Sequence, residues 1–240
     1  MGAPTVDALI DAWEQGLGAS PTRRALVLLR AAHPGASADE LAGLTLGERD
    51  VSLLKLRVTL FGDHIEALGS CPACDEELDV SFDVSRLLGS LPPAGTVVRE
   101  MVMDSCAATV RPPTSADVLA VLGEGTLENA GARLLERCVT RTAGSTDGGA
   151  PAALLDRVAE EVVAADPAAR IQLGLACAEC GHTWSEVLDV AGFVWSEVAA
   201  WARRTLRDVH LLARAYGWRE ADILALTPRR RAAYLELVTG

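Results

Sequence analysis

The chain has 240 residues, of which 50% are hydrophobic and 23% are charged, as is typical of folded globular proteins rather than disordered ones. Its formal net charge of -11 disfavours general attraction to nucleic acid or to anionic lipid. No apolar run approaches the roughly 20 residues that span a bilayer, and the first ten residues lack the basic and apolar regions of a signal peptide. We therefore expect a cytoplasmic protein with no membrane partner.

Residues 1 to 64 are expected to form an N-terminal helical region. Apolar residues recur at helical spacing over residues 6 to 15. Ser20 and Pro21 then resemble an N-cap followed by proline at the first helical position, which predicts a helix to about Ala32. Ser37 and Glu40 form a capping-box pattern for a short helix. Residues 47 to 61 are the fourth helix candidate.

The middle of the chain has a different pattern. Residues 65 to 68 and 77 to 84 alternate as short strands would. A hairpin is expected over residues 96 to 103 and 107 to 111, turning near Asp104 and Ser105. Helices are expected after Thr114 or Ser115, over residues 127 to 140, and from Pro151 to about Asp166. Residues 171 to 175 read as another strand.

The C-terminal region, residues 192 to 240, is again expected to be helical. Apolar residues spaced by three or four predict one face of a long helix that ends at Gly217: Val194, Val198, Trp201, Thr205, Val209, Leu212 and Tyr216. A short helix over residues 220 to 225 and a last one after Thr227 and Pro228 follow.

The same end of the chain is basic and aromatic. From Trp195 to Gly240 there are eight Arg and five acidic residues, so this stretch is +3 and the remainder is -14. Arg and aromatic side chains are typical anchors of protein interfaces. The alternative is that the aromatic residues fill the core of this region.

Two C-x2-C pairs carry the strongest chemical signal: Cys71 with Cys74, and Cys177 with Cys180. A C-x2-C turn presents two thiolates on one side of a tight knuckle, and two facing knuckles complete the four-sulfur tetrahedron that zinc prefers. The pairs are separated by 102 residues, much farther than in a compact zinc finger. We therefore predict one structural zinc ion that joins two distant segments.

An internal repeat supports this pairing. The same distance separates each second cysteine from an Asp-Val dipeptide, at Asp83-Val84 and Asp189-Val190. A residue with left-handed backbone conformation is expected directly after each knuckle. Asp75 follows the first knuckle and Gly181 the second, and Asp and Gly are among the few residue types that tolerate this conformation. The two halves therefore resemble strand–knuckle–strand units of a zinc ribbon split by an insertion.

Three other interpretations of the cysteines are a redox dithiol, disulfides and unrelated surface thiols. A thioredoxin-like site needs one C-x2-C pair at a strand-to-helix turn, and cytosolic disulfides are disfavoured. Cys106 and Cys138 are predicted to be small buried hydrophobic residues. His182 could compete as a ligand, but a hydrogen bond to the knuckle or plain exposure is expected instead.

We expect no enzymatic activity. The Gly-rich stretches around Gly123 and Gly144 lack the pattern of a phosphate-binding loop, and no catalytic motif such as G-x-S-x-G or H-E-x-x-H is present. A zinc ion held by four cysteines has no open coordination position for water.

Several short motifs follow one another in a characteristic order over nearly the whole chain: Leu60-Phe-Gly62, the two knuckles, residues 111 to 117, 165 to 168, 180 to 184 and 195 to 198, Tyr216-Gly-Trp218, and residues 222 to 226 and 231 to 235. This order resembles the T4-type phage baseplate protein family, a group of baseplate hub assembly proteins that is also encoded with phage-like contractile injection systems.

The resemblance implies a non-enzymatic role in building or forming the baseplate of a contractile tail, and incorporation into a phage-like particle. Baseplate or hub proteins are the implied partners. The C-terminal helices, with Trp201, Tyr216, Trp218 and Tyr234, are the candidate docking surface. A permanent component and a transient assembly chaperone are both compatible with it.

The expected fold is therefore α+β. A zinc-ribbon-like unit over residues 65 to 191 contains an insertion, at about 91 to 167, with a hairpin and helices. Helical N- and C-terminal arms flank the unit. The alternative function is a zinc-ribbon regulator that binds nucleic acid through the arginines of the last helices, although the acidic total charge disfavours it.

Overall fold

The computed structural model describes residues 2–92, 98–103, 106–123, 126–141 and 152–239. It is mixed helix and sheet, as the sequence predicts, with helices dominating and three small antiparallel sheets. The predicted turn at Asp104 and Ser105, the predicted Gly-rich loop over residues 143 to 150 and the predicted helix start at Pro151 lie outside the described residues.

The N-terminal region contains four helices: α1 (Val6–Gly16), α2 (Pro21–Ala32), α3 (Ala38–Ala42) and α4 (Leu46–Phe61). Each begins at a side-chain cap. Ser20 accepts a hydrogen bond from the Arg23 amide, and Ser37 with Glu40 forms the predicted reciprocal capping box. Four helix starts are thus fixed by local chemistry that the sequence displays.

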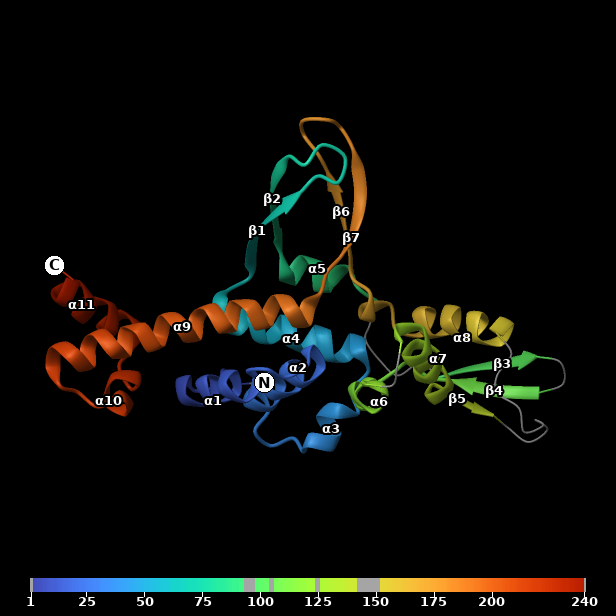
Figure 1. The fold of residues 1–240 in the computed structure, drawn as a ribbon, viewed down its shortest axis with the longest axis horizontal. Helices are drawn as coiled ribbons and strands as arrows, with labels where there is room; N and C mark the ends of the chain where they lie inside the picture. Colours follow the sequence, from blue (N-terminus) through green and yellow to red (C-terminus); the bar gives the residue numbers. More distant parts are fainter. Residues whose placement is uncertain (1, 93–97, 104–105, 124–125, 142–151, 240) are drawn as a thin grey trace.

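Two hairpins follow, far apart in the chain. The first consists of β1 (His64–Ser70) and β2 (Glu77–Asp83), and the second of β6 (Gln172–Ala176) and β7 (Thr183–Val187). Both rise from the helical layer and form one projection (Figure 1), which we call the prong and define as residues 64–83 and 172–187.

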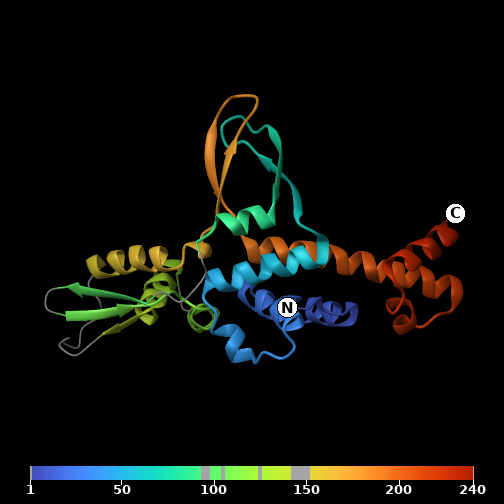
Figure 2. The same ribbon diagram turned by 180° about the vertical axis from the view of Figure 1, so that it is seen from behind.

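The segment between the hairpins begins with α5 (Val84–Ser90), which lies at the base of the prong (Figure 2). The rest of the segment extends to one end of the molecule, with the sheet order β3-β4-β5. Its elements are β3 (Arg99–Met103), β4 (Cys106–Val110), α6 (Ser115–Val121), α7 (Leu127–Arg137), β5 (Val139–Arg141), α8 (Ala152–Ala165) and the 3-10 turn η1 (Pro167–Ala169). Val110 and Val158 form its small core.

The C-terminal region runs along the layer and past it. The long helix α9 (Val190–Tyr216) ends at Gly217, which adopts the predicted left-handed conformation with φ of 68°. The short helix α10 (Glu220–Leu224) and the last helix α11 (Pro228–Thr239) fold back on its end. Among the described helices, none combines the length and apolar character that a membrane span requires.

One main hydrophobic core lies below the prong. Fully buried side chains of α2, α4 and the first half of α9 meet there, among them Leu28, Leu54 and Val198. Ile65 of β1 and Val84 of α5 join it at the base of the first hairpin. The helices before and after the prong therefore share one core, and the prong rises from it.

A buried carboxylate joins elements within the insertion. The side chain of Asp117, 3% exposed, accepts hydrogen bonds from Arg111, Arg137 and Thr114. Burial alone would raise the pKa of Asp117, but Arg111 and Thr114 hold it well below its usual range. This carboxylate joins the end of β4, α6 and α7 inside the insertion.

Two local expectations were wrong. Residues 138 to 140, predicted as the end of a helix, instead lead into the edge strand β5, where Val139 pairs with Val110. Residues 84 to 90 form helix α5, although Val84 was expected to be the last residue of a strand. In both places a partner from another part of the chain decides the conformation.

A close backbone contact connects the insertion to the main core. The amide of Gly47 in α4 donates to Oδ2 of the buried Asp166 at 2.8 Å. A Cβ at Gly47 would overlap Oδ1 of Asp166 and stand 2.9 Å from Cβ of Ala168. Only glycine lets the two segments approach this closely.

We therefore expect Gly47→Ala to destabilise the protein by about 2 kcal/mol or more, because overpacking displaces a buried carboxylate. Gly131→Ala is the matched control: it lies on the exposed side of α7 with open space around it, so it should stabilise by about 0.5–1 kcal/mol. Urea unfolding of both variants measures the contrast. Equal changes in the free energy of unfolding for the two variants would show that the contact at Gly47 does not require glycine.

Candidate metal centre

The prong is built from two hairpins with similar patterning. In the first, Ile65, Ala67, Val80 and Phe82 face inward while His64, Glu66 and Asp83 are exposed. In the second, the half-buried Leu173, Leu175 and Trp184 share one face. The period of two in each sequence thus gives each hairpin one inner face, and it sets the direction in which the chain enters each knuckle.

The two knuckles have the same backbone geometry. The Cys71 amide donates to the carbonyl of Glu76 at 2.9 Å, and the Cys177 amide donates to the carbonyl of His182 at 2.8 Å. Asp75 and Gly181, each directly after a second cysteine, have φ of 58° and 72°. Both predicted left-handed residues are confirmed. This turn directs the two sulfur atoms of each knuckle to the same side.

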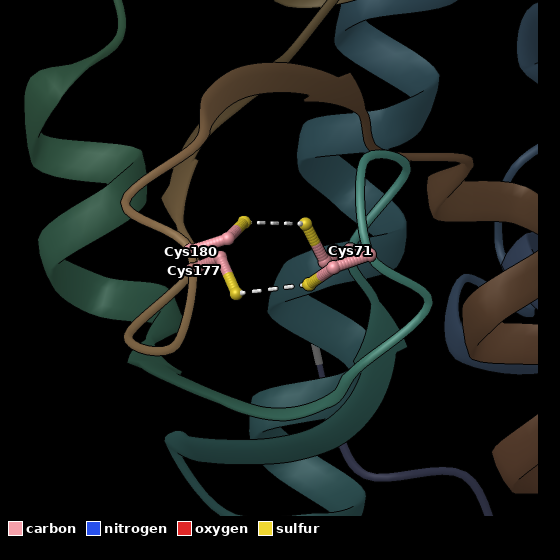
Figure 3. Close-up of side chains that lie close together, drawn as sticks. Cys71, Cys177 and Cys180 are labelled. Atoms are coloured by element: carbon pink, nitrogen blue, oxygen red, sulfur yellow. Dashed lines mark hydrogen bonds between the residues drawn. The ribbon is translucent and has the colours of Figure 1, made fainter.

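The four cysteines meet at the top of the prong (Figure 3). Sγ of Cys71 lies 3.7 Å from Sγ of Cys180, and Sγ of Cys74 lies 3.7 Å from Sγ of Cys177. All four sulfur atoms lie within 4.8 Å of one another. The cysteines of the two predicted pairs therefore form a single cluster, and all four are free thiols.

The sulfur spacing fits a tetrahedral metal site. With Zn–S bonds of 2.3 Å, two ligands of a tetrahedron stand about 3.8 Å apart, close to the two shortest separations. A disulfide would require about 2.05 Å. Four thiolates are soft ligands that suit Zn²⁺ and iron–sulfur centres rather than Mg²⁺ or Ca²⁺. The cluster is compatible with one structural metal ion such as zinc.

The electrostatics of the cluster also fit a cation. Burial tends to raise the pKa of the Cys71 thiol, but the amides of Ala73 and Cys74 and the nearby thiols lower it to about 7. The Glu76 amide tends to lower the pKa of Cys74, yet its three thiol neighbours raise it to about 12. One thiolate thus opposes ionisation of the next, and a bound cation would remove that opposition.

The two cysteines of each knuckle differ in exposure. Cys71 and Cys177, 0% and 3% exposed, lie inward, whereas Cys74 and Cys180 are exposed. The backbone amides of Ala73, Cys74, Glu76 and His182 donate to sulfur in the two knuckles. Such hydrogen bonds orient the ligands and stabilise their negative charge.

The Asp-Val repeat marks the exits of the two hairpins. Asp83 ends β2 and precedes α5, and Asp189 caps α9 by accepting the amide of Gly192. The following Val84 and Val190 are both buried, at 0% and 1% exposure. The Asp-Val repeat therefore marks the change from strand to helix at the end of each hairpin. The sequence showed the repeat but not that a helix begins there.

Other predicted residues lie outside the cluster. Cys138 is buried as predicted, and burial raises the pKa of its thiol to about 11; the side chain of Cys106 lies outside the described residues. His182 is exposed, stacks on Trp184 and directs its amide to Cys180. In the described part of the chain, these four cysteines are the one group of potential metal ligands that converges.

The four aromatic residues of the predicted docking surface separate into two places. Trp201 packs against the main core. Tyr216, Trp218 and Tyr234 pack together, with ring centroids 4.7 to 5.9 Å apart, and Trp218 and Tyr234 cover a small core of Val209, Leu212 and Ile223. These aromatic residues thus contribute to packing, and Tyr216 remains 39% exposed.

Sequence reasoning missed the residue that fixes the prong to the layer. Arg57 of α4, 4% exposed, donates to the carbonyls of Gly62 and His64 at the entry to β1 and forms a paired ion bridge with Glu197 of α9. An arginine inside an otherwise apolar helical repeat was the one signal for it in the sequence.

No protein-family model matches the chain, and searches of curated proteins and of solved structures find no match either. The resemblance to baseplate proteins therefore depends on the order of the sequence motifs alone.

Proposed function

We propose that Cys71, Cys74, Cys177 and Cys180 hold one zinc ion in a split, zinc-ribbon-like unit. The 3.7 Å sulfur separations support it, together with the matched knuckles and the amides directed at sulfur. A zinc ion with four thiolate ligands is a structural cross-link. It has no free position at which water or a carbonyl could bind.

We further propose that the chain is a non-enzymatic structural or assembly protein of a phage-type contractile tail baseplate. The observation that carries a scaffolding role is the cluster itself, which joins segments more than 100 residues apart and fixes a prong above one shared helical core. The ordered motifs of the sequence support the baseplate context.

The C-terminal helices are the proposed docking region for a baseplate or hub partner. Their most exposed large apolar side chains are Leu237, 75% exposed, and Tyr216, 39% exposed. The C-terminal helices lie at the end of the molecule opposite the insertion (Figure 1). An amphipathic helix with such anchors suits docking into a groove on a partner.

Two measurements test these proposals separately. Metal analysis of the native chain should find about one zinc per chain. Co-expression with the sheath, tube and baseplate proteins of a contractile tail should recover at least one of them with this chain, and the pair Leu237→Asp and Tyr216→Ala should reduce that recovery at least tenfold. Leu17→Asp, at an exposed apolar residue after α1, is the matched control.

Zinc content far below one per chain would overturn the metal assignment. Recovery of no tail protein by the unaltered chain would overturn the baseplate role, whatever its zinc content. Equal recovery by the C-terminal variant and the Leu17→Asp control would remove the docking claim.

A further inference from the structure

The charges of this protein are segregated between two of its parts. The prong contains no Lys or Arg, and it has six acidic residues in its first hairpin: Glu66, Asp75, Glu76, Glu77, Asp79 and Asp83. Glu179 and Glu186 in the second hairpin bring the total to eight, and all eight are exposed. The prong thus carries -8 of the chain's net charge of -11.

The outer face of the first hairpin gathers four of these carboxylates. The strand register pairs His64 with Asp83, Glu66 with Ser81, Leu68 with Asp79 and Ser70 with Glu77, so all eight side chains share one face. Glu77 and Asp79 are two residues apart, about 7 Å along the strand. Leu68 lies among them and is 69% exposed, beside an open depression lined by Glu66, Asp79 and Ser81.

The opposite charge lies on the second half of α9 and beyond it. Residues 203 to 239 include eight Arg and four acidic residues, a balance of +4. Arg203, Arg207 and Arg214 are spaced by four and seven residues, which places them on one side of the helix. All three are exposed, on the side opposite the buried Thr205, Val209 and Leu212. This arginine stripe is about 16 Å long.

The two charged surfaces do not meet within one molecule. The prong stands above the layer, whereas the second half of α9 runs toward the C-terminal end (Figures 1 and 2). No ion pair joins them among the described residues, and no carboxylate of the described chain lies within 4.0 Å of the stripe's guanidinium groups. The sulfur cluster and Arg57 hold the prong upright, so each surface is open to another molecule.

We infer that the acidic outer face of the first hairpin docks on the arginine stripe of a second copy of this chain. A second copy is the expected partner because the same chain carries both the acidic face and the arginine stripe. The contact joins two different surfaces, so a pair of copies keeps one open prong and one open stripe, and association continues into rings or chains. Exposed ion pairs make such a contact weak and strongly dependent on salt.

Charge-reversed variants test this contact. Glu66→Lys with Glu77→Lys and Asp79→Lys reverses the prong, and Arg203→Glu with Arg207→Glu and Arg214→Glu reverses the stripe. Sedimentation at about 50 mM salt should show the wild-type chain associating, and at about 0.5 M salt it should return to the 25.2 kDa chain mass. Each variant alone should remain monomeric, because both of its surfaces then carry the same sign.

An equimolar mixture of the two variants gives the sharpest result. The intact stripe of one variant still fits the intact prong of the other, and the reversed prong and the reversed stripe are complementary as well, so the mixture should recover the association of the wild-type chain. Zinc content and circular dichroism confirm that both variants are folded. A wild-type chain that is monomeric at low salt, variants that still associate alone, or a mixture that forms no complex would overturn the inference. So would a stripe that binds duplex DNA while the chain does not self-associate.

Discussion

Replacing Cys71 by serine is expected to abolish metal binding and to unfold the prong while the helical layer persists. Cys71 is fully buried, and its sulfur lies 3.7 Å from that of Cys180 in the opposite knuckle. A serine hydroxyl is a poor ligand for zinc at neutral pH, and three cysteines on two separate hairpins leave the site open. Zinc should fall from about one per chain to less than a tenth.

The unfolding should remain local because of how the two parts are stabilised. Each hairpin is an isolated two-stranded sheet, and such hairpins are marginally stable in water. The layer beneath has its own core of fully buried side chains from α2, α4 and α9, such as Leu28, Leu54 and Val198. Chelation of the wild-type chain should therefore reproduce the effect of Cys71→Ser.

Local unfolding of the prong can be detected with a protease chosen to match its sequence. Trypsin cannot cut within the prong, which has no Lys or Arg, but a protease that cleaves after glutamate finds Glu66, Glu76, Glu77, Glu179 and Glu186. Cleavage at these sites should accelerate at least tenfold on loss of metal, with most of the helical circular dichroism retained. Cys138→Ala, at the buried cysteine outside the cluster, should keep its zinc and its protection.

Two results would contradict this picture. If Cys71→Ser kept a full zinc ion, the metal would not depend on this sulfur atom. If the helical signal disappeared together with the metal, the layer would not be an independent folding unit.

The helices were predictable wherever local chemistry determines them. Ser20 with Pro21, and Ser37 with Glu40, mark helix starts that the structure confirms, because capping uses groups within four residues of each other. The long apolar stripe of α9 was equally clear. Residues 138 to 140 were not predictable, because their strand exists only through pairing of β5 with β4 across the insertion.

The metal centre was predictable as a set of residues but not as a place in the fold. The C-x2-C spacing identified the four cysteines, and Gly181 and Asp75 were expected to have the positive φ that they adopt. The contacts that fix the prong and the insertion to the main core could not be read from spacing. Arg57 with Glu197 and Gly47 with Asp166 each join residues more than 100 positions apart, and one sequence contains no signal that pairs them.

Arg57 is the second position where we expect a large effect. Its guanidinium group donates to both carboxylate oxygens of Glu197, at 2.9 and 3.0 Å, and to the carbonyls of Gly62 and His64, at 2.6 and 2.8 Å. The Arg57 side chain is 5% exposed and that of Glu197 is 27% exposed. One side chain thus joins α4, the entry to β1 and α9 at the base of the prong.

Arg57→Leu should lower the free energy of unfolding by about 3–5 kcal/mol, because it leaves a carboxylate and two carbonyls without their partner. Arg57→Lys should recover only part of this loss, since an ammonium group cannot reproduce the planar fork. The measurement is urea unfolding with zinc present. The exposed Arg30→Leu, at the end of α2, is the control and should change stability by less than about 0.5 kcal/mol.

The double variant Arg57→Leu with Glu197→Leu separates the missing ion pair from the missing carbonyl bonds. Removing both charges should be less damaging than Arg57→Leu alone, because no unpaired carboxylate then remains. The unsatisfied carbonyls of Gly62 and His64 should still keep the double variant well below the wild type. A loss for Arg57→Leu as small as that of Arg30→Leu would show that the base of the prong is held by apolar packing and by the metal, and not by this arginine.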